Sequence, residues 1–221
     1  MEVMHRLATI PGAPEPADGA LPFVEQKGAE IVLLSSADTD LAAVAALLEN
    51  EPHLSAACLR ALNLAALGHP AVIDHYVATT LAEASVVLVR LLGGRGHWSY
   101  GLERLQAWSR GGAGRTLLVV AGTAEEERSL ADLGNADADL TLALASGLRE
   151  GGTANLRQVL RCLERLRLHQ PVPLPVIEPA PDPLPHDWRD ESGARVGVIL
   201  YRAQLQACLL YTSPSPRDRT R

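Results

Sequence analysis

Near the middle of the chain, a pair of glycines is followed by four side chains that could bind a ligand: Arg95, His97, Trp98 and Tyr100. A guanidinium group pairs with carboxylates, aromatic rings pack against flat apolar groups, and imidazole is a common metal ligand. The glycines allow a tight turn, which would gather these side chains at the end of the preceding element. We take the four as candidate residues for binding a ligand or a neighbouring domain. The same pattern also suits a purely structural turn in which Trp98 packs against the rest of the protein.

The element that must position these side chains is the apolar run VVLVRLL at residues 86–92. A run of this kind is typical of a strand covered on both faces, as in a parallel α/β sheet. Such sheets bind ligands in the crevice beyond the carboxyl ends of their strands. The glycine turn stands at that end, which makes it the best local candidate for a site.

The same alternation of strand, loop and helix recurs along the chain. Apolar runs predict strands at residues 5–10, 31–34, 58–64, 86–92 and 116–120. Helical spacing of apolar residues predicts helices from 41, over 71–81, over 100–108, through 133, over 139–149 and from 153. We expect Ser99 and Thr153 to cap two of these helices, and Thr123 with Glu126 to form a capping box. The pattern predicts an α/β domain, flavodoxin-like or related, with a mostly parallel sheet and flanking helices.

Composition divides the chain into four parts. Residues 1–169 read as the α/β domain, and 170–194 as a linker, because seven prolines fall within 170–185. The run RVGVILY and the residues after it, 195–207, read as the start of a second, truncated domain. Residues 208–221 have no periodicity, and their back-translation resembles a transposon-based sequencing adapter, so we expect them to be a non-native tail.

Charge and composition exclude several classes of protein. A net charge of -6 and an isoelectric point near 5.6 argue against nucleic acid as a partner, because such binding requires neutralisation of phosphates. The sequence has neither a signal-peptide pattern nor an 18-residue apolar run, so we expect a cytoplasmic protein with no membrane span. The three cysteines have no CxxC spacing and suggest neither a disulfide framework nor a zinc site.

Other motifs give weaker signals. The turn reads GxGxxS and lacks the third glycine of the dinucleotide fingerprint, and no GxSxG nucleophile motif occurs. His69 and His75 lack the spacing of a metal site. Asp38 and Asp40 could bind a cation at the end of a strand, although the dipole of a helix start also favours acidic residues there. The only lysine, Lys27, does not stand in a GK[ST] phosphate-binding motif.

Four segments in order resemble the cobaltochelatase large-subunit family, CobN, which is related to the large subunit of magnesium chelatase. They are EIVLLSSADTD at 30–40, VVLVRLLGGRGHWSYGLERL at 86–105, REGGTANLRQVLRCL at 149–163 and RVGVILYRAQLQA at 195–207. Members of that family are several times longer, so the resemblance identifies the chain as an N-terminal fragment.

The resemblance implies an ATP-dependent enzyme that inserts Co2+ into hydrogenobyrinic acid a,c-diamide during aerobic cobalamin synthesis. It implies that separate ATPase partner subunits hydrolyse ATP, and that a corrin-type tetrapyrrole is the substrate. On this reading Arg95, His97, Trp98 and Tyr100 line the edge of a tetrapyrrole cleft. We assign no catalytic residue and no metal site, and expect the fragment alone to be inactive. Two alternatives stay open: a magnesium chelatase large subunit, or a non-enzymatic α/β docking or ligand-binding module.

Overall fold

The computed structural model describes residues 23–54, 58–125 and 127–179. The strand predicted at 5–10, the linker beyond 179, the predicted second domain and the tail lie outside the described residues. Within the described ranges, no helix has the length and apolar character needed to cross a bilayer.

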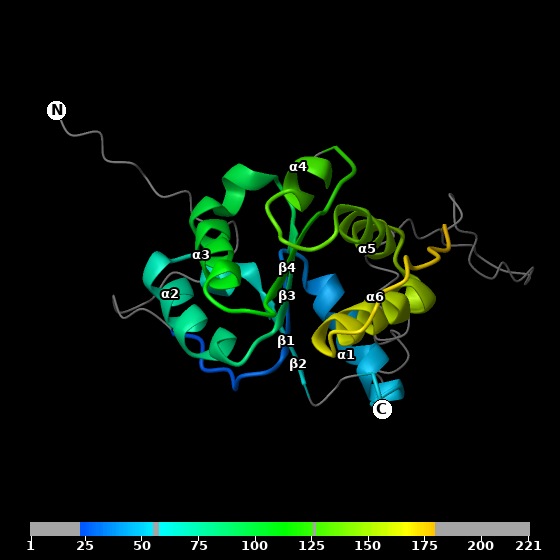
Figure 1. The fold of residues 1–221 in the computed structure, drawn as a ribbon, viewed down its shortest axis with the longest axis horizontal. Coiled ribbons are helices and arrows are strands. Elements are labelled where there is room, and N and C mark those ends of the chain that lie inside the picture. Colours follow the sequence, from blue (N-terminus) through cyan, green and yellow to red (C-terminus); the bar gives the residue numbers. More distant parts are fainter. Residues whose placement is uncertain (1–22, 55–57, 126, 180–221) are drawn as a thin grey trace, which may run out of the picture.

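Within the described residues, four parallel strands form the centre of the domain (Figure 1). They are β1 (Ile31–Ser35), β2 (Leu59–Asn63), β3 (Val86–Leu91) and β4 (Thr116–Ala121). Their order across the sheet is β2-β1-β3-β4, and β1 pairs with both β2 and β3 in parallel register. Every residue of β1 and β3 is buried, because helices cover both faces of the sheet. The predicted α/β fold with a parallel sheet is confirmed.

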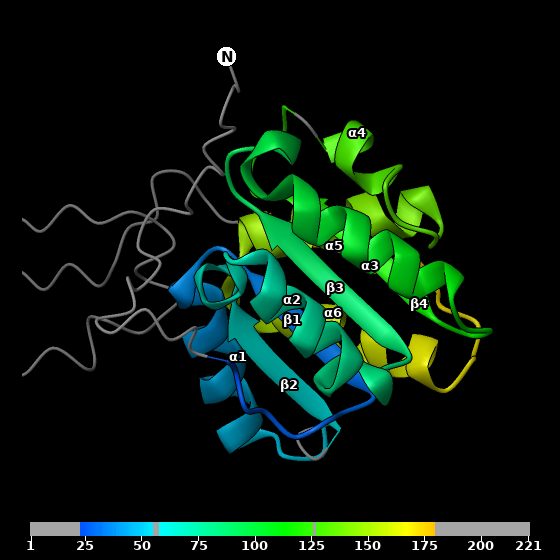
Figure 2. The same ribbon diagram turned by 90° about the vertical axis from the view of Figure 1, so that its left-hand side faces the viewer.

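Helices lie in two layers, one on each face of the sheet (Figures 1 and 2). One layer contains α2 (Pro70–Ala78) and α3 (Ser99–Arg110), and the other contains α1 (Asp38–Asn50), α5 (Ala138–Glu150) and α6 (Gly152–Arg167). The short α4 (Glu127–Ala131) packs beside β4. Each layer has its own apolar core, made largely of leucine and valine. The sheet therefore separates two cores, and α1 and α3 cover opposite faces.

This topology creates a change of direction between β1 and β3. The chain leaves β1 toward α1 on one face and leaves β3 toward α3 on the other (Figure 1). In open α/β sheets the crevice at such a point, beyond the carboxyl ends of the strands, is where ligands bind. The glycine turn after β3 lies at this edge of the sheet.

Two predicted helix caps are wrong. Ser99 is the first residue inside α3, with helical backbone angles, because the short 3-10 turn Arg95–Trp98 runs directly into the helix. Thr153 likewise stands inside α6, whose preceding residue, Gly151, has a positive φ of 69°. An N-cap residue has a non-helical backbone and stands just before the helix, whereas Ser99 and Thr153 both lie inside their helices. The predicted capping box includes Glu126, which lies outside the described residues.

Candidate functional site

The turn after β3 is built from two glycines with left-handed backbone angles. Gly93 has a φ of 91° and Gly94 a φ of 74°, values that residues with a Cβ atom rarely adopt. The Cβ of any other residue at Gly93 would also press on the imidazole of His97, at 3.3 Å. The predicted glycine turn is confirmed, and it brings the ring of His97 close to the end of the strand.

Trp98 is part of the core between α2 and α3. Its side chain is almost completely buried, and its indole Nε1 donates a hydrogen bond of 3.1 Å to the main-chain oxygen of Leu67. The ring lies over Gly101, where an added Cβ would approach it to 2.1 Å. Because so little of the ring reaches solvent, Trp98 mainly anchors the turn to the helices.

Tyr100 and Arg104 meet on the surface at Asp74 of α2. The hydroxyl of Tyr100 donates a hydrogen bond of 2.9 Å to Asp74, and Nε of Arg104 lies 2.6 Å from the other carboxylate oxygen. The hydrogen bond to Asp74 is the main cause of a raised pKa at Tyr100, since the acceptor carboxylate favours the protonated hydroxyl. These contacts join α2 to α3 on their exposed side.

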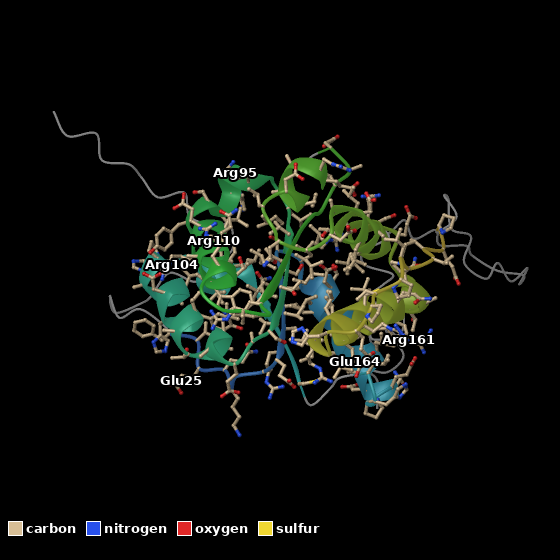
Figure 3. All side chains as sticks on the ribbon, in the orientation of Figure 1. Glu25, Arg95, Arg104, Arg110, Arg161 and Glu164 are labelled. Atoms are coloured by element: carbon tan, nitrogen blue, oxygen red, sulfur yellow. The ribbon has the colours of Figure 1, made fainter. Side chains whose placement is uncertain are left out.

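The structure brings three of the four predicted site residues together. His97, Trp98 and Tyr100 line a hollow of about 60 Å³ beside Pro70 and Ile73. Arg95 is exposed and does not line it; Figure 3 shows Arg95 at the outer end of the turn. Pockets that enclose small ligands measure about 300–1,000 Å³. These residues can therefore form one wall of a larger site, but they do not enclose a macrocycle by themselves.

Sequence reasoning missed a buried polar cluster at the same edge of the sheet. Arg90 of β3 and Asp40 of α1 form an ion pair of 2.5 Å, and Ser35 donates a hydrogen bond of 2.5 Å to the same carboxylate. All three side chains are nearly excluded from water. The one sequence signal for this cluster was Arg90 itself, a charged residue inside the apolar run at 86–92. Its partner, Asp40, stands 50 positions away in the chain.

The residues considered as metal ligands make structural contacts instead. Asp38 accepts a hydrogen bond of 2.6 Å from Asn63, and Asp40 is bound by Arg90 and Ser35. His69 caps α2 through Nδ1. Across the described residues, no group of three or more histidine, cysteine, aspartate or glutamate side chains could hold a metal ion.

A larger hollow lies on the opposite helical layer. It has a volume of about 300 Å³ and runs between α1 and the corner where α5 meets α6. Its walls are mainly apolar and include Ala43, Leu47, Leu148 and Leu156. At one end Glu51 pairs with Arg157, whose hydrogen bonds are the main cause of a lowered pKa at Glu51. This hollow is a candidate binding surface that no sequence motif indicated.

Comparison with known proteins places these features in a family. No protein-family model matches the chain. The aerobic cobaltochelatase subunit CobN of Pseudomonas aeruginosa is 36% identical over an aligned length of 222 residues, and the alignment covers 92% of this chain and 17% of that protein. The CobN subunit of a Sinorhizobium species is 39% identical over 82 residues, 37% of this chain and 6% of that protein.

A solved structure agrees with the sequence matches. The catalytic subunit of cobaltochelatase from Mycobacterium tuberculosis superposes with a TM-score of 0.55 at 27% identity, covering 80% of this chain and 14% of that one. The chain thus spans 17% of the length of the Pseudomonas relative. By sequence over most of its length, and by fold, the chain belongs to the CobN family of cobaltochelatase subunits, of which it represents a segment.

Proposed function

We propose that the chain is a segment of the large subunit of an ATP-dependent cobaltochelatase, which inserts Co2+ into hydrogenobyrinic acid a,c-diamide in aerobic cobalamin synthesis. The observation that carries this proposal is the 36% identity to a CobN subunit across 92% of the chain. The parent protein is then a metal chelatase, a ligase that forms nitrogen–metal bonds. Cobalt is its substrate rather than a resident cofactor.

Within that enzyme the chain serves as an α/β module and does not insert cobalt alone. In support, it matches only 17% of its relative, which leaves most of the large subunit to supply the chemistry. We assign ATP hydrolysis to separate partner subunits, because the only lysine, Lys27, is followed by Gly28 and Ala29 and not by the residues of a phosphate-binding loop.

We assign the turn after β3 to contact with the substrate or with a neighbouring domain. Arg95 and Tyr100 are exposed and can reach a partner, and a guanidinium suits the peripheral carboxylates of a corrin-type tetrapyrrole. Trp98 acts indirectly, since its buried ring holds the turn in place. The side chain of His97 is half-buried, so it is less exposed than Arg95 and Tyr100 and less buried than Trp98, and it lines the small hollow.

An insertion assay tests the proposal. The purified chain, mixed with the ATPase partner subunits, ATP, Co2+ and hydrogenobyrinic acid a,c-diamide, should give no cobalt insertion, whereas a complete large subunit should. In the complete subunit, Arg95→Ala should raise the KM for hydrogenobyrinic acid a,c-diamide and leave the thermal stability unchanged. Trp98→Ala should instead lower the melting temperature. Turnover by the chain alone would contradict the assignment of the chemistry to the rest of the subunit.

The two alternatives predict different results in the same assay. A magnesium chelatase large subunit would insert Mg2+ into a porphyrin and would not accept the corrin substrate. A docking or ligand-binding module would bind its partner without any insertion by the complete protein. The apolar hollow beside α1 favours this second alternative, and sedimentation of the chain with the ATPase subunits would detect such binding.

A further inference from the structure

The residues that follow α6 return along the domain. Residues 171–179 are extended and run back toward the start of α6 (Figure 1). Arg165 donates a hydrogen bond of 2.9 Å to the main-chain oxygen of Pro171 as the segment begins. Val172 packs against the apolar core that α5 and α6 share with the sheet. This part of the predicted linker is therefore in contact with the domain.

Asn155 of α6 binds the main chain at the far end of the segment. Its Oδ1 accepts a hydrogen bond of 2.8 Å from the Glu178 amide, and its Nδ2 donates one of 2.8 Å to the Glu178 oxygen. The same Nδ2 donates to the main-chain oxygen of Gly151 at 2.7 Å, and the Asn155 side chain is buried. An amide that bonds both main-chain groups of one residue acts as a neighbouring strand would, and it is indifferent to the side chain at that residue.

Gly147 of α5 leaves space for the side chain of Ile177, the residue before Glu178. A Cβ added there would lie 3.0 Å from Cδ1 of Ile177 and 3.3 Å from Cγ2 of Val159. The missing side chain thus leaves a notch that Ile177 fills, whereas the adjacent Val176 is 79% exposed. The two contacts together select an aliphatic residue followed by any residue with a free amide.

We propose that the α5–α6 face is a binding site for an extended, proline-rich segment of polypeptide, and that residues 171–179 occupy it within the same chain. The prolines favour this conformation before docking, which lowers the conformational entropy lost on binding. Residues 171–179 of the predicted linker then belong to the surface of the domain. The proposal does not depend on the chelatase assignment.

Methyl NMR of the full 221-residue chain, labelled at the isoleucine Cδ1 and valine Cγ methyl groups, tests it. The isoleucine Cδ1 region then holds one signal from each of only five residues: Ile10, Ile31, Ile73, Ile177 and Ile199. The signal of Ile177 should show nuclear Overhauser contacts to Val159. Absence of these contacts in the unaltered chain would overturn the proposal.

Two variants weaken the site from opposite sides. Asn155→Ala removes the amide on the domain, and Glu178→Pro removes the donor on the segment without disturbing the bond from Asn155 to Gly151. Each should move the Ile177 methyl toward its random-coil shift and abolish its contacts to Val159, with the Ile31 and Ile73 signals unchanged.

The matched controls are Gln158→Ala on the same helix and Val176→Pro at the exposed neighbour, and both should retain the contacts. The proposal fails if Glu178→Pro keeps the contacts, or if Val176→Pro loses them as Glu178→Pro does. If Asn155→Ala unfolds the domain, the comparison of the two proline variants decides the question alone.

Discussion

Arg90 and Asp40, which stand 50 positions apart, form a buried ion pair of 2.5 Å that joins β3 to the first turn of α1. Ser35 at the end of β1 donates to the same carboxylate, so three elements meet at one charged group. Removing two charges from water costs several kcal/mol per ion, and their attraction offsets this cost only when the geometry is good. The pair thus fixes how α1 sits on the sheet more than it stabilises the fold.

Breaking this pair should be costly. Arg90→Ala leaves the Asp40 carboxylate buried without its partner, and the free energy of unfolding should fall by about 3–5 kcal/mol. Replacing both residues by leucine should recover most of that loss, because no buried charge remains. Urea unfolding of the single and double variants measures both values. A single variant that loses less than about 1 kcal/mol would contradict a buried, mutually dependent pair.

The contact of Gly101 with the Trp98 ring predicts an unusual penalty for alanine in a helix. Alanine normally gains about 1 kcal/mol over glycine there, but its Cβ would meet the indole at 2.1 Å. We expect Gly101→Ala to lower the free energy of unfolding by about 1–3 kcal/mol and to change the tryptophan fluorescence. Gly96→Ala is the matched control, since its Cβ would meet nothing within 4 Å, and it should change stability by no more than about 0.5 kcal/mol.

His169 ends α6 with a left-handed backbone, at a φ of 52°. A residue with a Cβ pays about 1–2 kcal/mol for this conformation, which glycine adopts freely. His169→Gly should therefore raise the free energy of unfolding by about 1 kcal/mol, measured by thermal or urea unfolding. His169→Ala retains the strain and should give no gain. Equal stability of the two variants would show that the backbone angle carries no cost.

The Glu51–Arg157 contact predicts a change in acid stability. The pKa of Glu51 is lowered in the folded protein, chiefly by its hydrogen bonds to Arg157. The contribution of Glu51 to the free energy of unfolding is therefore fully present at pH values above the pKa of the unfolded chain, 4.5. That contribution is lost as the pH falls through the lower, folded pKa. In the Glu51→Gln variant, the free energy of unfolding should therefore decrease less steeply as the pH falls below 4.5. The exposed Glu49→Gln is the control and should leave the slope unchanged; urea unfolding as a function of pH records both.

Strands β1, β3 and β4 could be predicted from the sequence because nearly all of their side chains are buried, on both faces of the sheet. A strand covered on both faces needs an apolar side chain at nearly every position, so the runs at 31–34 and 116–120 already locate β1 and β4 to within a residue. The glycine turn was predictable for a related reason, since two consecutive positive φ angles favour glycine. The family resemblance drawn from such segments is confirmed by the sequence and structural matches.

The candidate site was only partly predictable. The side chains after β3 were identified by type, but their directions depend on contacts with α2 and with the short turn before it, which lie in a distant part of the chain. Leu67 binds the indole of Trp98, and Asp74 binds Tyr100, so one candidate lies in the core and another on the surface. The predicted helix caps at Ser99 and Thr153 failed for a similar reason: a capping residue needs a non-helical backbone as well as a suitable side chain, and both residues lie inside their helices.

The amino-acid sequence by itself determined the alternation of strands and helices, the parallel sheet and the family, because each depends on local periodicity or on the order of segments. Only the tertiary structure decided that Arg90 pairs with Asp40, that Trp98 is turned inward and that Asn155 binds the main chain at Glu178. Each of these contacts joins residues that are far apart in the chain. Their geometry is set when the helices pack on the sheet, and no local pattern encodes it.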